Sequence, residues 1–243
     1  MGHGTPDWWG QAPKSTTYAL GDMAELAVRL GGISTFDRRG DVLWEDNFAN
    51  GAADVTVFED GTDSLVYPVV GGGFSHGIGL CMVTGSIQGD YAMITKKLFF
   101  PALGGLGLEI AFSVPQNVKS IRCGIDVYDG TNVTYYAVRY LHTTGQVQVY
   151  TTAGGWETIG TPGIEPEGVE CRNMIKLVLD TLAGTYVRAR YNSHDYDPSA
   201  VPPLVVQDST KPYIVANVMV TNNVEAAVAV AIDNVIVTQN EPV

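Results

Sequence analysis

Short segments in which apolar and polar residues alternate occupy most of the chain from Ile33 onward. In the segment Ile175–Asp180, for example, isoleucine and two leucines fall on one face, and the other face ends in charge. Gly-containing turn signals separate these segments, at Asp129-Gly130, Thr144-Gly145, Gly154-Gly155 and Ala183-Gly184. The pattern predicts an all-β fold, a two-sheet antiparallel jelly-roll sandwich.

The N-terminal part of the chain follows a different pattern. Residues 1–19 are rich in Gly, Pro and small polar residues, which indicates an extended arm. A capping-box spacing then predicts one short helix over 22–30, ended by a glycine pair. We therefore expect an N-terminal region of arm, short helix and hairpin start over 1–41, followed by the sandwich over 42–243.

Three short motifs resemble concanavalin A-like lectin/glucanase sandwiches. Leu43–Phe48 resembles their opening strand, and Ala231–Val237 resembles their closing strand. Ile175–Asp180 followed by Gly184–Arg188 is similar to a hairpin of laminin G-like modules. The resemblance implies that the first and last strands of the sandwich are neighbours. It therefore predicts that Val42–Phe48 and Ile232–Val237 pair in one sheet.

The resemblance also suggests two kinds of site to look for. Glucanases of this fold carry Glu-x-Asp-x-x-Glu on one strand, and this triplet is absent from the sequence. Related sandwiches often hold a structural calcium near the terminal strands, where Asp46 and Asp233 lie in this sequence. The alternative is that both aspartates cap turns. We expect no catalytic residues and no cofactor beyond this possible calcium.

The charge and the cysteine content of the chain limit which partners and which cellular compartment we expect. The chain has a net charge of −12, which argues against nucleic acid or an anionic membrane as a partner. The longest apolar run, Ala226–Ile232, is too short to span a bilayer. No signal-peptide pattern opens the sequence, and the widely spaced Cys81, Cys123 and Cys171 are expected to be unpaired thiols of a protein made in a reducing cytoplasm.

The arm carries two adjacent tryptophans that its own few apolar residues cannot bury. Trp8 and Trp9, together with Met23 and Leu26 of the predicted helix, are therefore candidate assembly contacts. Their presence on an acidic sandwich resembles the structural proteins of phages and virus-like particles. The resulting main hypothesis is a non-enzymatic, homo-oligomeric virion protein, such as a capsid decoration, tail or fibre component, that also contacts other particle subunits.

A cluster of aromatic residues in one third of the chain supports an alternative function. Tyr128, Tyr136, Tyr150 and Trp156 are candidates for stacking on sugar rings if they line an exposed sheet face. This alternative is a lectin-like, carbohydrate-binding module, although the same rings could also fill the core. A second alternative is an atypical glycoside hydrolase or polysaccharide lyase.

Overall fold

The computed structural model describes residues 40–70, 78–101, 104–114, 117–165 and 168–243. These residues contain sixteen β-strands and no α-helix, arranged in two antiparallel sheets of eight strands each. The predicted all-β sandwich is thus confirmed. The predicted arm and short helix, with the candidate contacts Trp8, Trp9, Met23 and Leu26, lie outside the described residues. In the described part of the chain, no helix has the length and apolarity to cross a lipid bilayer.

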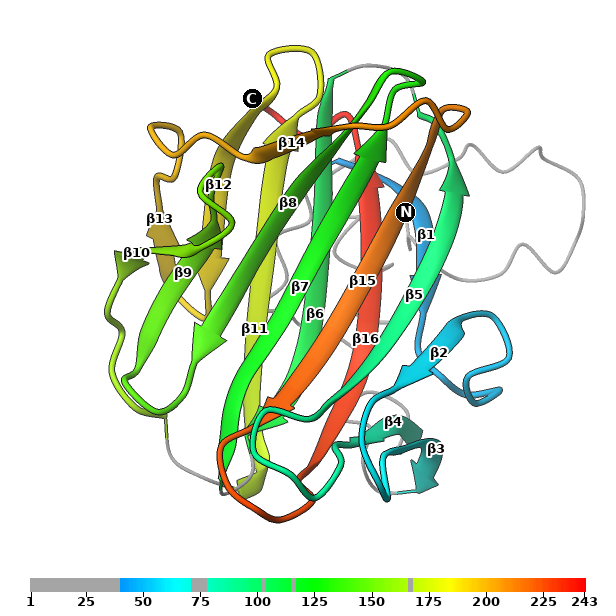
Figure 1. Cartoon of the computed structure of the whole chain (residues 1–243), viewed down its shortest axis with the longest axis vertical. Helices are drawn as coiled ribbons and strands as arrows, with labels where there is room; N and C mark the ends of the chain where they lie inside the picture. The colour runs from blue at the N-terminus through cyan, green and yellow to red at the C-terminus, as the bar shows by residue number, and fades with distance from the viewer. Residues whose placement is uncertain (1–39, 71–77, 102–103, 115–116, 166–167) are drawn as a thin grey trace, which may run out of the picture. The chain divides into compact units, whose positions relative to one another are not determined.

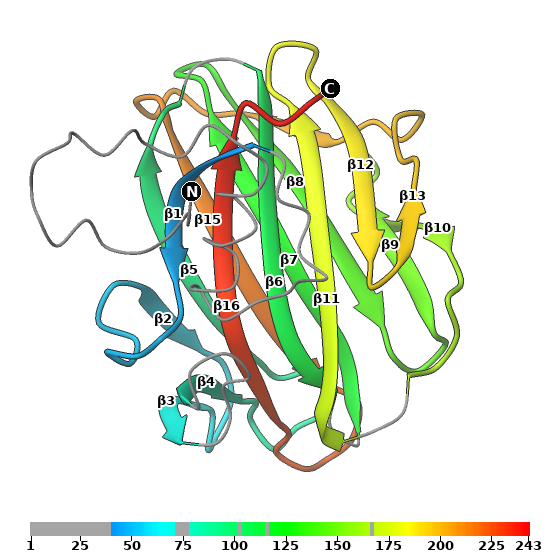
Figure 2. The ribbon, with the colours of Figure 1, turned by 180° about the vertical axis from the view of Figure 1, so that it is seen from behind.

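The first sheet, here called sheet A, faces the viewer in Figure 2. Its strands follow the order β13 (His194–Tyr196), β12 (Thr185–Tyr191), β11 (Gly168–Asp180), β6 (Gly105–Val114), β16 (Ala229–Gln239), β4 (Ile78–Val83) and β3 (Leu65–Val70). The short strand β1 (Asp41–Asp46) pairs with β16 beyond the end of β4. Because Asp46 lies opposite Val235, the predicted pairing of the first and last strands is confirmed.

The second sheet, here called sheet B, faces the viewer in Figure 1. Its order is β10 (Trp156–Gly160), β9 (Gln146–Tyr150), β8 (Asn132–Leu141), β7 (Val118–Tyr128), β15 (Tyr213–Asn222), β5 (Tyr91–Phe99) and β2 (Thr56–Glu59). A further strand, β14 (Leu204–Gln207), pairs with the first part of β8. The last part of β8 pairs with β9.

The core lies between the two sheets and is built from alternate residues of their strands. Phe112 and Leu177 from sheet A and Ile125 from sheet B are fully buried there. Because successive side chains of a strand point to opposite faces, each strand sends every second side chain into this core. The other side chains form the outward faces of the sheets.

One tyrosine links the two sheets directly. Between its pairings with β14 and with β9, strand β8 leaves the backbone of Ala137 without a partner on that side. The hydroxyl of Tyr186, on β12 of sheet A, fills this gap. It accepts a hydrogen bond from the Ala137 amide at 3.1 Å and donates one to the Tyr150 carbonyl at 2.8 Å. The ring of Tyr186 also packs edge-on against Tyr136, with 5.3 Å between the ring centroids.

Two of the predicted turns show why glycine occupies them. Gly130 and Gly184 have φ angles of +96° and +70°, a region that residues with a Cβ atom rarely enter. In the second turn the Asp180 carboxylate accepts a hydrogen bond from the Leu182 amide at 2.8 Å. The sequence signals therefore mark real hairpins, which set the register of the strands on either side.

Cys81 and Cys123 are unpaired and buried, as predicted. The side chain of Cys171 lies outside the described residues, so its thiol stays a prediction. Burial raises the pKa of the Cys123 thiol, which keeps the sulfur protonated and unreactive at neutral pH.

This burial predicts a difference in reactivity between the folded and unfolded states. In a variant with Cys81→Ala and Cys171→Ala, the remaining thiol of Cys123 should react with Ellman's reagent far more slowly in the native protein than in guanidinium chloride. The rate of colour development measures this difference. Equal rates in the folded and unfolded states would contradict the placement of Cys123 in the core.

Candidate functional site

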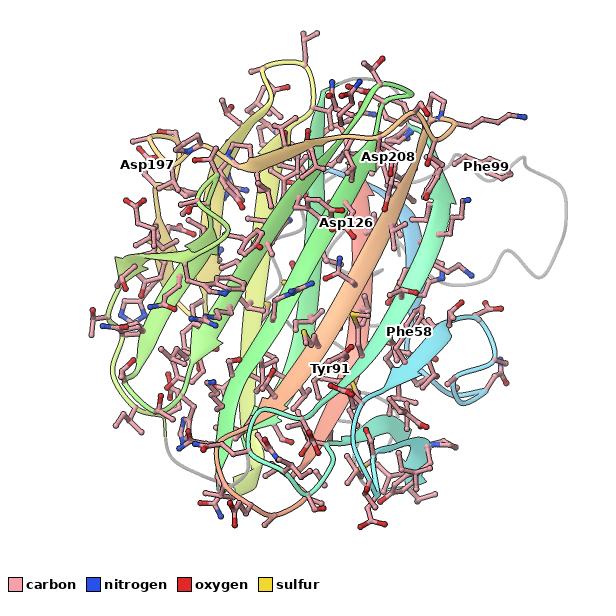
Figure 3. All side chains as sticks on the ribbon, viewed as in Figure 1. Phe58, Tyr91, Phe99, Asp126, Asp197 and Asp208 are labelled. Carbon is pink, nitrogen blue, oxygen red and sulfur yellow. The ribbon has the colours of Figure 1, made fainter. Side chains whose placement is uncertain are left out.

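The outward face of sheet B carries a cluster of polar side chains at its centre. On β7 the odd-numbered residues from Ile121 to Val127 are buried in the core, so Arg122, Gly124 and Asp126 point outward. Figure 3 shows Asp126 on this face, in the upper half of the view, near the end of the central strand β7. The central position matters because four neighbouring strands can contribute side chains to it.

The register of sheet B brings residues from distant parts of the sequence together. Arg122 lies opposite Arg139 of β8 on one side and opposite Met219 of β15 on the other. Gly124, the next outward residue of β7, lies opposite Asn217. A Cβ atom at Gly124 would lie 2.6 Å from the Tyr136 carbonyl oxygen, so the backbone here leaves no room for a side chain. The side chains of Arg122, Arg139 and Asn217 therefore lie around a position where the sheet surface carries no side chain.

Arg122, Asn217 and Asp126 form a hydrogen-bonded chain. The Nη2 atom of Arg122 donates to Oδ1 of Asn217 at 3.1 Å, and Nδ2 of Asn217 is 3.3 Å from Oδ1 of Asp126. Burial raises the pKa of Asp126 to about 6, while the positive charge of Arg122 and the hydrogen bond from Asn217 act to lower it. Asp126 thus remains mostly ionised at neutral pH and orients the buried Asn217.

Arg139 is held by a second set of hydrogen bonds. Its Nε and Nη2 atoms donate to Oε1 of Gln148 at 2.9 and 2.7 Å. Gln148 in turn donates to Gln146 at 3.1 Å and to the Thr158 hydroxyl at 3.0 Å. Burial, followed by the nearby charge of Arg122, lowers the pKa of Arg139 to about 10, so this guanidinium remains charged at neutral pH.

Two aromatic rings flank this polar cluster. The guanidinium of Arg139 lies 4.1 Å from the centroid of the Trp156 ring, within the range of a cation–π interaction. The ring of Tyr150 is 5.2 Å from that of Trp156 and inclined to it by 57°. Both rings are half-buried. Their packing fixes an aromatic surface next to hydrogen-bonding groups.

The predicted stacking residues do not form a single cluster. Tyr150 and Trp156 lie together, as just described. Tyr128 stacks instead on Tyr213, with 4.3 Å between the centroids, and lies opposite Val133 at the other end of β8. Three of the four predicted rings therefore lie on the outward face of sheet B, in two separate groups.

The fourth predicted stacking residue, Tyr136, is placed wrongly by the sequence-based hypothesis. Its side chain is 2% exposed and lies in the core, so it cannot contact a ligand on the sheet face. The neighbouring Tyr135 points outward instead and is half-buried. The sequence held a signal for this. Alternate residues of a strand face the same side, so Tyr136 lies on the side of apolar Val138 and Tyr135 on the side of charged Arg139.

The possible calcium site gains no support from the geometry. Oδ1 of Asp46 accepts a hydrogen bond from the Phe48 amide at 2.7 Å, so this residue caps a turn, as the alternative held. Asp233 is buried on β16. Among the described residues, no group of three or more His, Cys, Asp or Glu side chains is placed to hold a metal ion.

A depression of about 430 Å³ elsewhere on the molecule is a weaker candidate site. It lies at the β12–β13 end of sheet A and includes none of the predicted residues. Its charged groups already have partners: Arg188 pairs with Glu241 at 3.7 Å, and Asp197 accepts a hydrogen bond from the Ser199 amide at 2.9 Å. The outward face of sheet B therefore remains the better candidate.

Comparison with known proteins identifies the class of fold. Neither the protein-family models nor the curated proteins include a match to this chain. Among solved structures, the chain is similar to the cellulose-induced protein Cip1, with a TM-score of 0.55 and 12% identity over 81% of this chain and 97% of that one. It is also similar to a carbohydrate esterase of the Shiga toxin-encoding bacteriophage phi24B, with a TM-score of 0.53 and 13% identity over 82% and 98% of the two chains.

A third similar structure is a protein of unknown function with a galectin-like fold from Bacillus subtilis. Its TM-score is 0.52 and its identity 11%, over 83% of this chain and 97% of that one. The chain also spans 19% of the length of a sialidase structure that it matches. These similarities establish the fold, a galectin-like and concanavalin A-like β-sandwich.

Proposed function

We propose that this protein is a lectin-like module that binds carbohydrate on the outward face of sheet B. The observation that carries the proposal is the placement of Trp156 and Tyr150 beside the hydrogen-bonded arginines, Arg122 and Arg139. Aromatic rings pack against the C–H faces of sugars, while planar amide and guanidinium groups bind hydroxyl groups. Side chains held in place before binding lose little conformational entropy when a ligand binds.

Binding without hydrolysis fits this face best. The described outward residues of β7, β8, β9 and β15 include one carboxylate, Asp126. Glycoside hydrolysis normally needs a pair of carboxyl groups on either side of the scissile bond. We therefore propose a binding protein, and release of reducing ends or unsaturated products from a bound oligosaccharide would contradict this part of the proposal.

The virion role expected from the sequence stays a prediction. It depends on Trp8, Trp9, Met23 and Leu26, which lie outside the described residues. Self-association and a location in a particle depend on the same residues. The described sandwich supports the carbohydrate-binding alternative instead.

The proposal is tested by removing the aromatic surface. A glycan array followed by titration calorimetry should find an oligosaccharide whose affinity falls about tenfold or more in Trp156→Ala. Tyr67→Ala is a matched control, because Tyr67 is a 39%-exposed aromatic residue on β3 of sheet A. Affinity that is unchanged in Trp156→Ala, or reduced equally in the control, would overturn the placement of the site.

A further inference from the structure

Two positively charged residues are direct neighbours on the proposed binding face. Arg122 and Arg139 are cross-strand partners on β7 and β8, so their Cβ atoms are about 5 Å apart. Like charges at such positions destabilise a sheet. The chain as a whole has a net charge of −12, so this local concentration of positive charge runs against its overall composition.

The hydrogen-bond partners of the two arginines are neutral amides rather than carboxylates. Gln148 accepts the hydrogen bonds from Nε and Nη2 of Arg139, and Asn217 accepts the bond from Nη2 of Arg122. The one nearby carboxylate, Asp126, is hydrogen-bonded to Asn217. The Nε atom of Arg122 is buried, and none of the described residues forms a hydrogen bond with it.

This arrangement is unfavourable for the protein alone. A buried donor without a partner loses its hydration and gains no bond in return. The half-buried guanidinium groups of Arg122 and Arg139 also repel each other. The nearby carboxylate of Asp126 supplies one negative charge against their two positive charges. An anion beside Arg122 would offset both costs, because a guanidinium binds a carboxylate through paired, charge-assisted hydrogen bonds.

We propose that the ligand is an acidic saccharide, whose sugar carboxylate binds at Arg122 while a sugar ring packs near Trp156. The inference rests on the carbohydrate-binding function proposed above and narrows its ligand class. Trp156 lies over Arg139, the cross-strand neighbour of Arg122, so the anion contact and the aromatic contact are adjacent. General attraction between opposite charges cannot supply this binding, because the acidic chain repels anions at long range.

The experiment compares the affinity of the protein for each acidic oligosaccharide with its affinity for the uncharged methyl ester of the same oligosaccharide. Short uronic-acid oligosaccharides and their methyl esters, which keep the sugar backbone and remove the charge, are titrated into the full-length protein by calorimetry. We expect at least one acid to bind about tenfold or more tightly than its ester. In Arg122→Gln the acid should bind no better than the ester, so the preference for the acid should be lost.

Two further variants keep the result interpretable. Arg122→Lys retains the positive charge without the planar fork and should recover only part of the preference for the acid. Arg190→Gln makes the same charge change as Arg122→Gln on the partly exposed surface of β12 in sheet A and should leave the preference intact. The thermal unfolding midpoint of each variant shows whether it is folded.

The possible outcomes separate the two proposals. Equal affinity for acid and ester, with loss of both in Trp156→Ala, would overturn the acidic ligand and leave the carbohydrate-binding function standing. A preference for the acid that survives in folded Arg122→Gln would overturn the role of Arg122. If the protein binds none of the acids, their esters or the array glycans, both proposals are overturned.

Discussion

Replacing Tyr186 with alanine should lower the free energy of unfolding by about 3–5 kcal/mol. Its side chain is fully buried and crosses from sheet A to sheet B, so its removal leaves a cavity between the sheets. The substitution also leaves the Ala137 amide and the Tyr150 carbonyl without their hydrogen-bond partner. Urea denaturation, followed by circular dichroism, measures the change.

A conservative variant separates the contribution of the Tyr186 hydroxyl to stability from that of its ring. Tyr186→Phe keeps the edge-on packing against Tyr136 and removes only the hydrogen bonds, so we expect a loss of about 1–3 kcal/mol. Tyr67→Phe, at an exposed site on β3 near the opposite edge of sheet A, should change stability by less than about 0.5 kcal/mol. Wild-type stability in Tyr186→Phe would show that the hydroxyl does not join the sheets.

Replacing Asp126 with asparagine should stabilise the protein at pH 8. The pKa of this carboxyl is raised to about 6 in the folded state from an ordinary value of 3.8. A raised acid pKa means that the folded state is favoured when the group is protonated, and that this contribution is lost as the pH rises through 6. Asparagine has no charge to lose, so the variant should gain about 1–3 kcal/mol at pH 8 and little at pH 4.

The pKa of Asp126 that this pH dependence reports is set together with its neighbours. Arg122 on its own strand, Tyr135 on β8 and Asn217 on β15 interact with the carboxyl group. Urea denaturation at pH 4, 6 and 8 gives the dependence. Asp197→Asn is the control, because hydrogen bonds to Ser199 lower the pKa of this exposed group and no gain at pH 8 is expected. A gain for Asp126→Asn that is equal at all three pH values would point to packing rather than to titration.

The sandwich could be predicted from the sequence because its signals are local. Alternation of apolar residues marks the strands, and glycines such as Gly130 and Gly184 mark the hairpin turns. The period of a strand and the geometry of a turn depend on residues close together in the chain. The pairing of the two end strands was predicted instead from the resemblance of Leu43–Phe48 and Ala231–Val237 to the end strands of known sandwiches.

The site was harder to predict because sheet pairing assembles it. Arg122 and Asn217 are 95 positions apart in the sequence and meet only because β7 pairs with β15. No local pattern specifies which strands become neighbours. The choice between Tyr135 and Tyr136 was different, since the charge of Arg139 already indicated which set of alternate residues faces outward.

The pairing of the first and last strands determines how this sandwich could be displayed by a larger assembly. Asp41 lies opposite Gln239, and the Asn240 side chain donates to the Asp41 carboxylate at 2.7 Å, so the chain enters and leaves the sandwich at one point. That point belongs to sheet A, whereas Arg122 and Trp156 belong to the opposite sheet. A sandwich tethered at these ends, or inserted there into a loop of another protein, would leave the proposed binding face on sheet B uncovered by the attachment. Several copies on one scaffold could then engage a polymeric glycan together and gain avidity without any change in the site.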